Sequence, residues 1–194
     1  MPLVDIFCPS IEEAFSSLFP DRYKALREKH PEQDLLQYFT PGDFRLVAET
    51  LLSMGCAVVG LKAGPNGWYL RCSDENRINQ MGKLKPDTIK AWACRELWHP
   101  GFVADTVVSA TGAGDVSIAA FLTAMLNGHG PVECMKLANA AGWANLKTLD
   151  ALGAVPGWDE LTKLSAALTA HEVSRLRNEK GWSWNGPEGV WEGS

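Results

Sequence analysis

Residues 109–122 read SATGAGDVSIAAFL, a turn with two glycines that leads into a strongly apolar helical stretch. Glycine allows close approach of a ligand to the backbone and adopts dihedral angles closed to other residues. The first N–H groups of a helix lack intrahelical acceptors and carry the positive end of the helix dipole. Gly112, Ala113 and Gly114 are therefore predicted to bind a phosphate, or the charge that develops on a phosphoryl group during transfer.

Asp115 follows these glycines in the first helical turn. The helix dipole favours its ionised form, and an ionised carboxylate beside an anion site can orient a hydroxyl and accept its proton during attack on a γ-phosphate. The same residues also fit a structural glycine loop in which Asp115 only interacts with the helix dipole. Spacing alone is equally consistent with both interpretations.

Two other glycine motifs are excluded at this position. A P-loop requires GxxxxGK[ST], and no lysine follows these glycines. A dinucleotide fingerprint starting at Gly112 requires glycine at position 117, which is Ser117. An NAD-binding domain is kept only as a third alternative.

The rest of the chain alternates between strand-like and helix-like segments. Strands are predicted over 3–7, 57–61, 68–71 and 103–108, and helices over 10–19, 22–29, 44–54, 114–126, a stretch after Pro131, and 159–177; residues 72–102 are expected to be irregular. Such alternation predicts an α/β layered fold whose sheet is mostly parallel and is flanked by helices.

Composition bounds the function. The chain has 194 residues, 46% of them hydrophobic and 21% charged, which suits a single globular domain. Its net charge of -5 offers no basic field for nucleic acid or an anionic membrane, and no apolar run is long enough to span a bilayer. The five cysteines include no CxxC pair, the four histidines have no zinc-ligand spacing, and the N-terminus has no basic leader, so we expect a cytoplasmic protein.

The stretch from Ser109 to Leu122 resembles the C-terminal signature of the PfkB (ribokinase-like) carbohydrate kinases. That signature usually begins Asp-Thr before its Gly-Ala-Gly-Asp core, whereas this chain has Ser109 and Ala110 there. The resemblance implies that Asp115 is the catalytic base and that Gly112, Ala113 and Gly114 form the anion hole. It also implies ATP and Mg²⁺ as cofactors. A monovalent cation is a further candidate, weakened by the missing aspartate.

Three other segments are similar to family elements in the same order. Gly64 and Gly67 match a strand-end motif near the nucleotide, in which Lys62 replaces the usual threonine, and Asn139 matches an asparagine that lines the adenine pocket. Outside the resemblance, Lys62 also reads as a solvated strand-end residue and Asn139 as a helix-surface residue.

The third segment, Ser10-Ile11-Glu12-Glu13, parallels a family element whose glutamate organises magnesium indirectly. This gives Glu13 as a candidate metal residue. The same four residues are also a capping box, in which Ser10 and Glu13 satisfy each other's backbone N–H groups.

The resemblance covers residues 3–165. We therefore expect a partial kinase domain over 1–180, without the family's N-terminal part and lid, followed by a loose tail over 181–194 that carries Trp182, Trp184 and Trp191. The predicted function is ATP-dependent phosphoryl transfer to a hydroxyl of a small sugar-like substrate. The alternative is a truncated, inactive remnant that binds nucleotide or only folds and self-associates. A sheet cut at this point leaves an apolar edge, so a homodimer through that edge is a further hypothesis.

Overall fold

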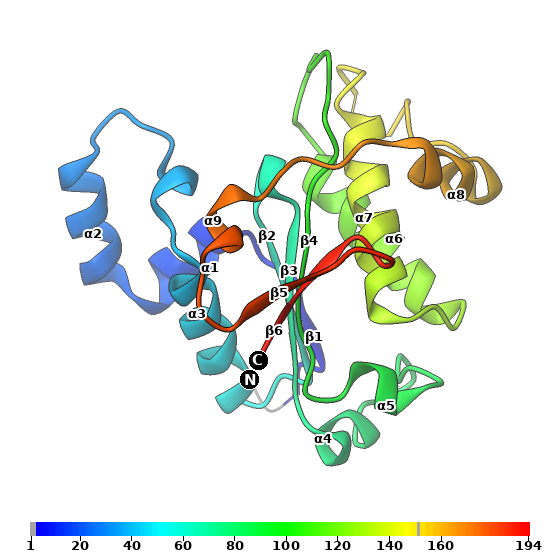
Figure 1. Cartoon of the computed structure of the whole chain (residues 1–194), viewed down its shortest axis with the longest axis horizontal. Coiled ribbons are helices and arrows are strands. Elements are labelled where there is room, and N and C mark those ends of the chain that lie inside the picture. The colour runs from blue at the N-terminus through cyan, green and yellow to red at the C-terminus, as the bar shows by residue number, and fades with distance from the viewer. Residues whose placement is uncertain (1–2, 151) are drawn as a thin grey trace.

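The computed structural model describes residues 3–150 and 152–194, which form a six-stranded sheet with helices on both faces (Figure 1). The strands, in the order in which they lie in the sheet, are β1 (Ile6–Phe7), β2 (Val58–Lys62), β3 (Trp68–Cys72), β4 (Glu96–His99), β6 (Val190–Gly193) and β5 (Trp182–Asn185). The predicted α/β layered fold is confirmed.

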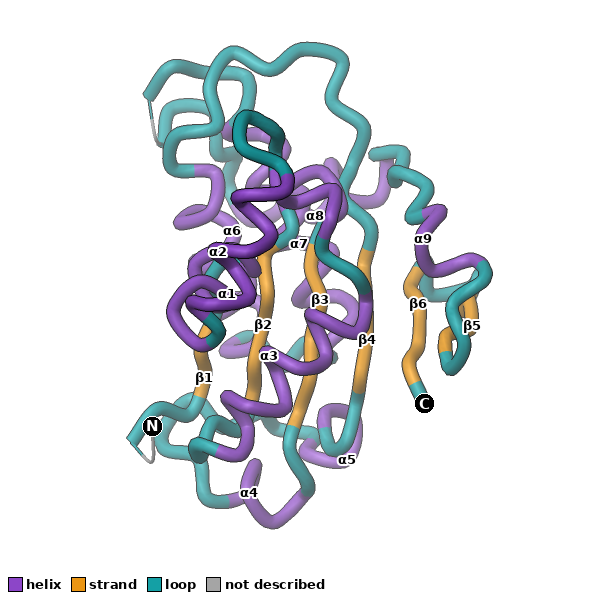
Figure 2. The backbone as a smooth tube through the Cα atoms, turned by 90° about the vertical axis from the view of Figure 1, so that its left-hand side faces the viewer, coloured by secondary structure: helices purple, strands orange, loops and turns teal. Residues whose placement is uncertain are grey.

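The helices form two layers, one on each face of the sheet (Figure 2). One layer holds α1 (Ile11–Leu18), α2 (Pro20–Lys29), η1 (Leu35–Tyr38), α3 (Pro41–Ser53) and α9 (Ser174–Arg177). The other holds α4 (Glu75–Asn79), α5 (Ile89–Trp92), α6 (Ala113–Leu126), α7 (Pro131–Asn145) and α8 (Trp158–Ala167), and η2 (Gly64–Asn66) joins β2 to β3.

Each layer has its own hydrophobic core because successive strand residues point to opposite faces. Trp68 and Leu70 of β3 are buried in the cluster that includes Phe121 of α6. Tyr69, between them, is buried in the cluster that includes Phe44 of α3. The sheet is thus covered on both sides.

The prediction of a mostly parallel sheet is wrong. Among the described residues only β1 and β2 pair in parallel, with Ile6 opposite Val58, and the other four pairings are antiparallel. The connection over residues 63–67 explains the first reversal. Five residues suffice for a hairpin, whereas a parallel crossover requires a dozen or more.

The segment between β3 and α6 also differs from expectation. Residues 96–99 form the buried strand β4, although residues 72–102 were expected to be irregular, and the strand predicted over 103–108 is a loop. Glu96 made β4 difficult to predict, because a carboxylate is rare in a buried strand. The Glu96 side chain is 2% exposed and accepts hydrogen bonds from Arg45 Nε and Tyr69 Oη, both at 3.0 Å. The helix predicted over 159–177 is divided into α8 and α9.

The tail is not a loose extension. Residues 182–193 form the hairpin of β5 and β6, and β6 pairs with β4 through Leu97 opposite Glu192 and Trp98 opposite Trp191. Figure 1 shows this hairpin, in red, against the central strands. The tail therefore extends the sheet beyond β4.

Candidate functional site

The glycine turn at the head of α6 leaves backbone N–H groups without intrahelical acceptors. Gly112 is the N-cap residue with φ 80°, a left-handed conformation that favours glycine. The Ala113 N–H donates to Ala110 O at 3.2 Å, whereas the N–H groups of Gly114 and Asp115 have no backbone acceptor among the described residues. These last two donors are free for a ligand.

Asn145 holds this turn from the neighbouring helix. Its side chain is fully buried at the end of α7, and Nδ2 donates to Thr111 O at 2.7 Å. The carbonyl that precedes Gly112 is thereby fixed, which stabilises the orientation of the N–H groups that follow. The sequence carries no signal for this role, because Asn145 lies far from the turn along the chain.

Lys62 brings a positive charge to the same place. It ends β2, and its Nζ lies 3.1 Å from the position that a Cβ on Gly114 would occupy. Glycine at 114 therefore allows the ammonium group to lie against the head of the helix. A cation at the positive end of a helix dipole is unfavourable unless an anion lies between them. Two carboxylates share this region, since Asp115 is in the first turn of α6 and the charge of Lys62 lowers the pKa of Glu13.

A cavity of ≈ 570 Å³ opens beside Lys62 and Gly114. Its wall contains most of the residues that the sequence assigned to nucleotide binding, namely Lys62, Gly64, Gly67, Asn139, Ala113 and Gly114. The rest of the wall is largely apolar, with Phe102, Trp143 and Leu146 among its members. The volume and the mixture of one charged position with apolar surface are typical of a small-molecule site.

A second hollow, a groove of ≈ 1130 Å³, runs along the free edge of β1. Residues 3–9 form its floor, α1 and α3 contribute one wall, and α6 contributes the other. Asp115 and Glu13 line this groove and do not line the smaller cavity. Lys62 lines both, so the two hollows meet at its side chain.

The turn between β2 and β3 requires glycine for steric reasons. Gly64 and Gly67 have φ values of 51° and 86°. A Cβ at Gly67 would lie 2.1 Å from His99 O and 2.4 Å from Gly101 N. The turn thus packs directly on the backbone that follows β4, and this contact shapes the cavity wall.

Asn139 lies on the cavity wall but also has a structural role. It is 9% exposed, and its Nδ2 donates to His99 O at 3.2 Å and to Pro100 O at 3.1 Å. Burial lowers the pKa of His99 to about 4, so this imidazole is neutral at pH 7. Asn139 therefore holds the backbone after β4 in the position that Gly67 contacts.

Glu13 forms the capping box that the sequence allowed. Its carboxylate accepts from Ser10 N at 2.9 Å, and Ser10 Oγ accepts from Glu13 N at 3.2 Å. Hydrogen bonds from Ser10 lower the pKa of Glu13, and the charge of Lys62 lowers it further. Glu13 is thus an ionised group on the groove wall. Within residues 3–150 and 152–194 there is no cluster of three metal-ligating side chains.

Comparison with known proteins finds a family similarity for part of this site. Residues 89–156, which include the glycine turn, Asp115 and Asn139, match the model of the pfkB family carbohydrate kinases. The match covers about a third of the chain and does not include Lys62 or Glu13. A search of curated proteins finds no significant match.

Solved structures extend the similarity to the whole fold. The Arabidopsis thaliana ribokinase complexed with ribose and ATP superposes with a TM-score of 0.59 and 22% identity over 84% of this chain and 41% of its own. The Salmonella enterica aminoimidazole riboside kinase, complexed with aminoimidazole riboside and an ATP analog, gives 0.54 and 18% over 84% and 43%. The Thermotoga maritima ribokinase gives 0.52 and 21% over 82% and 41%. The chain has a ribokinase-like fold and spans about two fifths of these structures.

The PfkB segment departs from its usual motif at Ser109 and Ala110. The Ser109 hydroxyl accepts a hydrogen bond from Thr111 N at 3.1 Å, so it stabilises the turn locally. A hydroxyl used in this way does not replace the charge of an aspartate.

In the described part of the chain, no helix is both long enough and apolar enough to cross a membrane.

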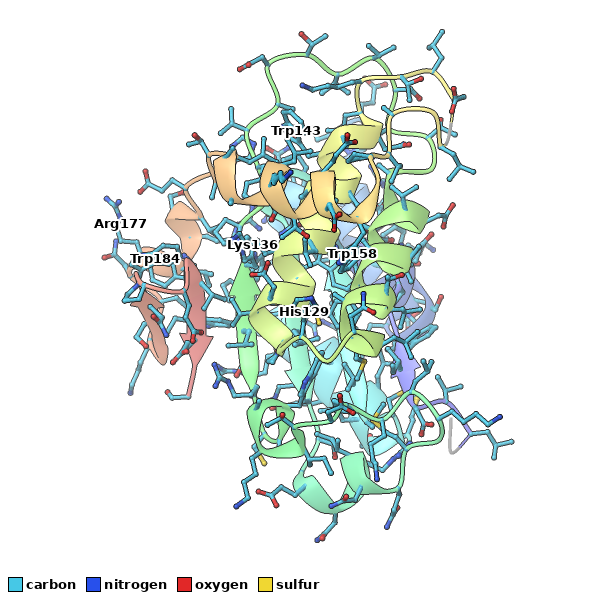
Figure 3. The ribbon with its side chains drawn as sticks, turned by 90° about the vertical axis from the view of Figure 1, so that its right-hand side faces the viewer. His129, Lys136, Trp143, Trp158, Arg177 and Trp184 are labelled. Atoms are coloured by element: carbon cyan, nitrogen blue, oxygen red, sulfur yellow. The ribbon has the colours of Figure 1, made fainter. Side chains whose placement is uncertain are left out.

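Sequence reasoning missed two cavity residues that interact with distant segments. Trp143, labelled on α7 in Figure 3, lines the cavity, and its Nε1 donates to Val103 O at 2.7 Å. The helical spacing of Asn139, Gly142, Trp143 and Leu146 was a usable signal, since these positions share one face. His171 also lines the cavity; it lies between α8 and α9, in a segment that was predicted to be helical and that carries no motif of a binding site.

Proposed function

We propose that the chain binds ATP in the smaller cavity and supports transfer of the γ-phosphoryl group to a hydroxyl held in the groove. The observation that carries this proposal is the position of Lys62. Its side chain lines both hollows and lies against the head of α6, where the free N–H groups of Gly114 and Asp115 point. The base and ribose would occupy the cavity, with the phosphates extending toward Lys62.

The chemistry then follows from charge and position. The acceptor hydroxyl loses its proton to the Asp115 carboxylate as its oxygen forms a bond to the γ-phosphorus. The bond between that phosphorus and the β,γ-bridging oxygen breaks, and ADP leaves. Charge on the phosphoryl oxygens is stabilised by the ammonium group of Lys62 and by the anion hole at Gly112, Ala113 and Gly114. The donors available in this turn are the N–H groups of Gly114 and Asp115, which have no backbone acceptor among the described residues.

Magnesium fits this site as an ion held mainly by water and phosphate. The described residues offer two carboxylates on the groove wall, Glu13 and Asp115, and no cluster of three ligands. Mg²⁺ commonly uses one or two carboxylates together with substrate phosphates. When bound it would neutralise phosphate charge. A monovalent cation has no part in this proposal, because Ser109 and Ala110 replace the family's usual Asp-Thr and the Ser109 hydroxyl already accepts from Thr111 N.

Fewer residues of this chain support the proposed acceptor site than the proposed nucleotide site. The groove presents Asp115 but is otherwise lined mainly by apolar residues, and the chain spans about two fifths of the kinases that it resembles. A small sugar-like alcohol is the proposed acceptor. The second candidate function, nucleotide binding without transfer, is favoured by this scarcity of polar groups around Asp115.

The test separates binding from transfer. Calorimetric titration with ATP, with and without Mg²⁺ and with NAD as the control ligand, is expected to show magnesium-dependent ATP binding alone. Lys62→Met should weaken that binding by about 10- to 100-fold, the value of one charge-assisted hydrogen bond to phosphate. Asp115→Asn should leave ATP affinity within about threefold and abolish phosphorylation of any sugar that the wild type accepts. Binding of NAD rather than ATP would refute the proposal, and ATP binding without turnover would favour the second candidate.

We further propose that the chain, when no acceptor occupies the groove, self-associates through the free edge of β1. This edge offers unpaired backbone groups between apolar walls, including Leu18 of α1 and Leu122 of α6. Sedimentation over a wide concentration range is expected to show a dimer, and a strict monomer at high concentration would contradict the proposal.

A further inference from the structure

The segment between α8 and α9, residues 168–173, passes beside the cavity as a strap and contributes His171 to its wall. Figure 1 shows it in orange, running from α8 across to α9 on the other side of the sheet. Backbone hydrogen bonds hold it to the loop after β4: Val103 N donates to Thr169 O at 2.9 Å, and His171 N donates to Gly101 O at 2.7 Å. Phe102 and Ala170 form a β-bridge between them.

The strap is anchored without the side chain of His171. Val173 is 3% exposed and Leu176 is fully buried in the core on the far side of the sheet. Arg175 Nη1 donates to Phe39 O at 2.9 Å. The His171 imidazole is partly exposed and lines the cavity. The neighbouring residues therefore anchor the strap and position His171, whose own side chain contributes little to that anchoring.

The other polar side chains on the cavity wall are already engaged. Ser117 Oγ donates to Gly114 O at 2.8 Å, and Asn139 Nδ2 donates to backbone carbonyls after β4. Trp143 Nε1 donates to Val103 O at 2.7 Å. Lys62 lies at the head of α6, where phosphate is expected. By contrast, the side chain of His171 has neither a hydrogen-bond partner among the described residues nor, like Lys62, a phosphate group expected beside it.

We propose that His171 hydrogen-bonds the base of the nucleotide in this cavity and that the strap thereby sets base preference. The inference rests on the proposed nucleotide site. An imidazole presents one donor and one acceptor when neutral, which suits the edge of a nucleobase. The apolar wall of Phe102, Trp143 and Leu146 can exclude water from such a pair but cannot itself distinguish one base from another.

The experiment compares a nucleotide with a ligand that has no base. Wild type, His171→Ala and His171→Gln are titrated with ATP, GTP and inorganic tripolyphosphate in the presence of Mg²⁺. Glu172→Ala serves as the matched control, because Glu172 is the adjacent strap residue and pairs with Arg177 instead of lining the cavity. Thermal unfolding confirms that each variant folds.

His171→Ala is expected to weaken ATP binding by about five- to tenfold, the loss of one hydrogen bond, and to narrow the difference between ATP and GTP. Tripolyphosphate binding should not change, and glutamine should restore part of the ATP affinity. Unchanged ATP affinity in His171→Ala, or an equal loss for ATP and tripolyphosphate, would refute the role of His171 and leave the proposed function intact. Absence of ATP binding by the wild type would overturn the proposed function, and the inference with it.

Discussion

Replacing Gly67 with alanine tests the contact that shapes the cavity. Gly67 has φ 86° and ψ -136°, a region that is nearly closed to other residues and costs about 1–3 kcal/mol. The added methyl group would lie 2.1 Å from His99 O and 2.6 Å from Pro100 C. Both are backbone atoms that cannot rotate away, so overpacking adds about 1–3 kcal/mol.

The free energy of unfolding should therefore fall by about 2–6 kcal/mol, a large part of the usual 5–15 kcal/mol of a domain. Urea denaturation followed by tryptophan fluorescence measures it, and thermal unfolding should shift by about 2–4 °C per kcal/mol. Two further variants separate the causes. Gly189 has φ 66° with no atom within 4 Å of an added Cβ, so alanine there reports backbone strain alone. Gly42 lies inside α3 at ordinary contact distance, so alanine there should be neutral or stabilising.

A loss in Gly67→Ala no larger than that in Gly189→Ala would refute the steric reasoning, since it would mean that the backbone after β4 moves freely. If the variant remains folded at low temperature, its ATP affinity should also fall, because the residues that move line the cavity. The Gly189→Ala variant should retain full affinity.

Three further predictions concern buried groups. The folded pKa of His99, about 4, lies below the ordinary value of 6.5, so the unfolded state binds the proton first and stability should fall by about 3 kcal/mol as the pH drops from 6.5 to 4. Urea titrations at several pH values should show this slope, and His99→Gln should reduce it. Glu96→Ala leaves buried donors such as Tyr69 Oη unpaired and should cost about 3–5 kcal/mol, with Glu96→Gln costing less; equal losses would contradict the charge argument. Burial raises the pKa of Cys134 to about 12, so a maleimide at pH 7 should label the exposed Cys94 and leave Cys134 unreacted until unfolding.

Short-range patterns in the sequence were sufficient to predict elements whose interactions join residues close together in the chain. The helix that begins after Gly112 follows from its glycine turn and apolar run, and α6 begins at Ala113. The strands β2 and β3 lie close to the apolar runs at 57–61 and 68–71 that predicted them. The capping box of Ser10 and Glu13 is present as its spacing predicts. In each case the partners are within a few residues of one another.

Sheet topology was not accessible in the same way, because strand pairing joins segments far apart in the chain. β4 carries Glu96, which reads as solvent-exposed until Arg45, Tyr69 and Arg71 are placed around it. The hairpin at 182–193 reads as a glycine- and tryptophan-rich tail until β4 offers it an edge. For the pairing of β3 with β4 and of β4 with β6, the orientation depends on long connections whose path the sequence does not specify, unlike the five-residue connection between β2 and β3.

Local sequence was enough to indicate the available chemistry. A family motif supplies a glycine-lined helix start with a carboxylate behind it, and a lysine outside that motif ends a strand. Tertiary structure alone decided that Lys62 lies against Gly114 where two hollows meet, and that Asp115 lines one hollow and not the other. It also brought His171 to the cavity from beyond α8. The physical reason is that covalent neighbours fix local conformation, whereas a site is formed by packing of residues whose separation along the chain carries no information about their distance in space.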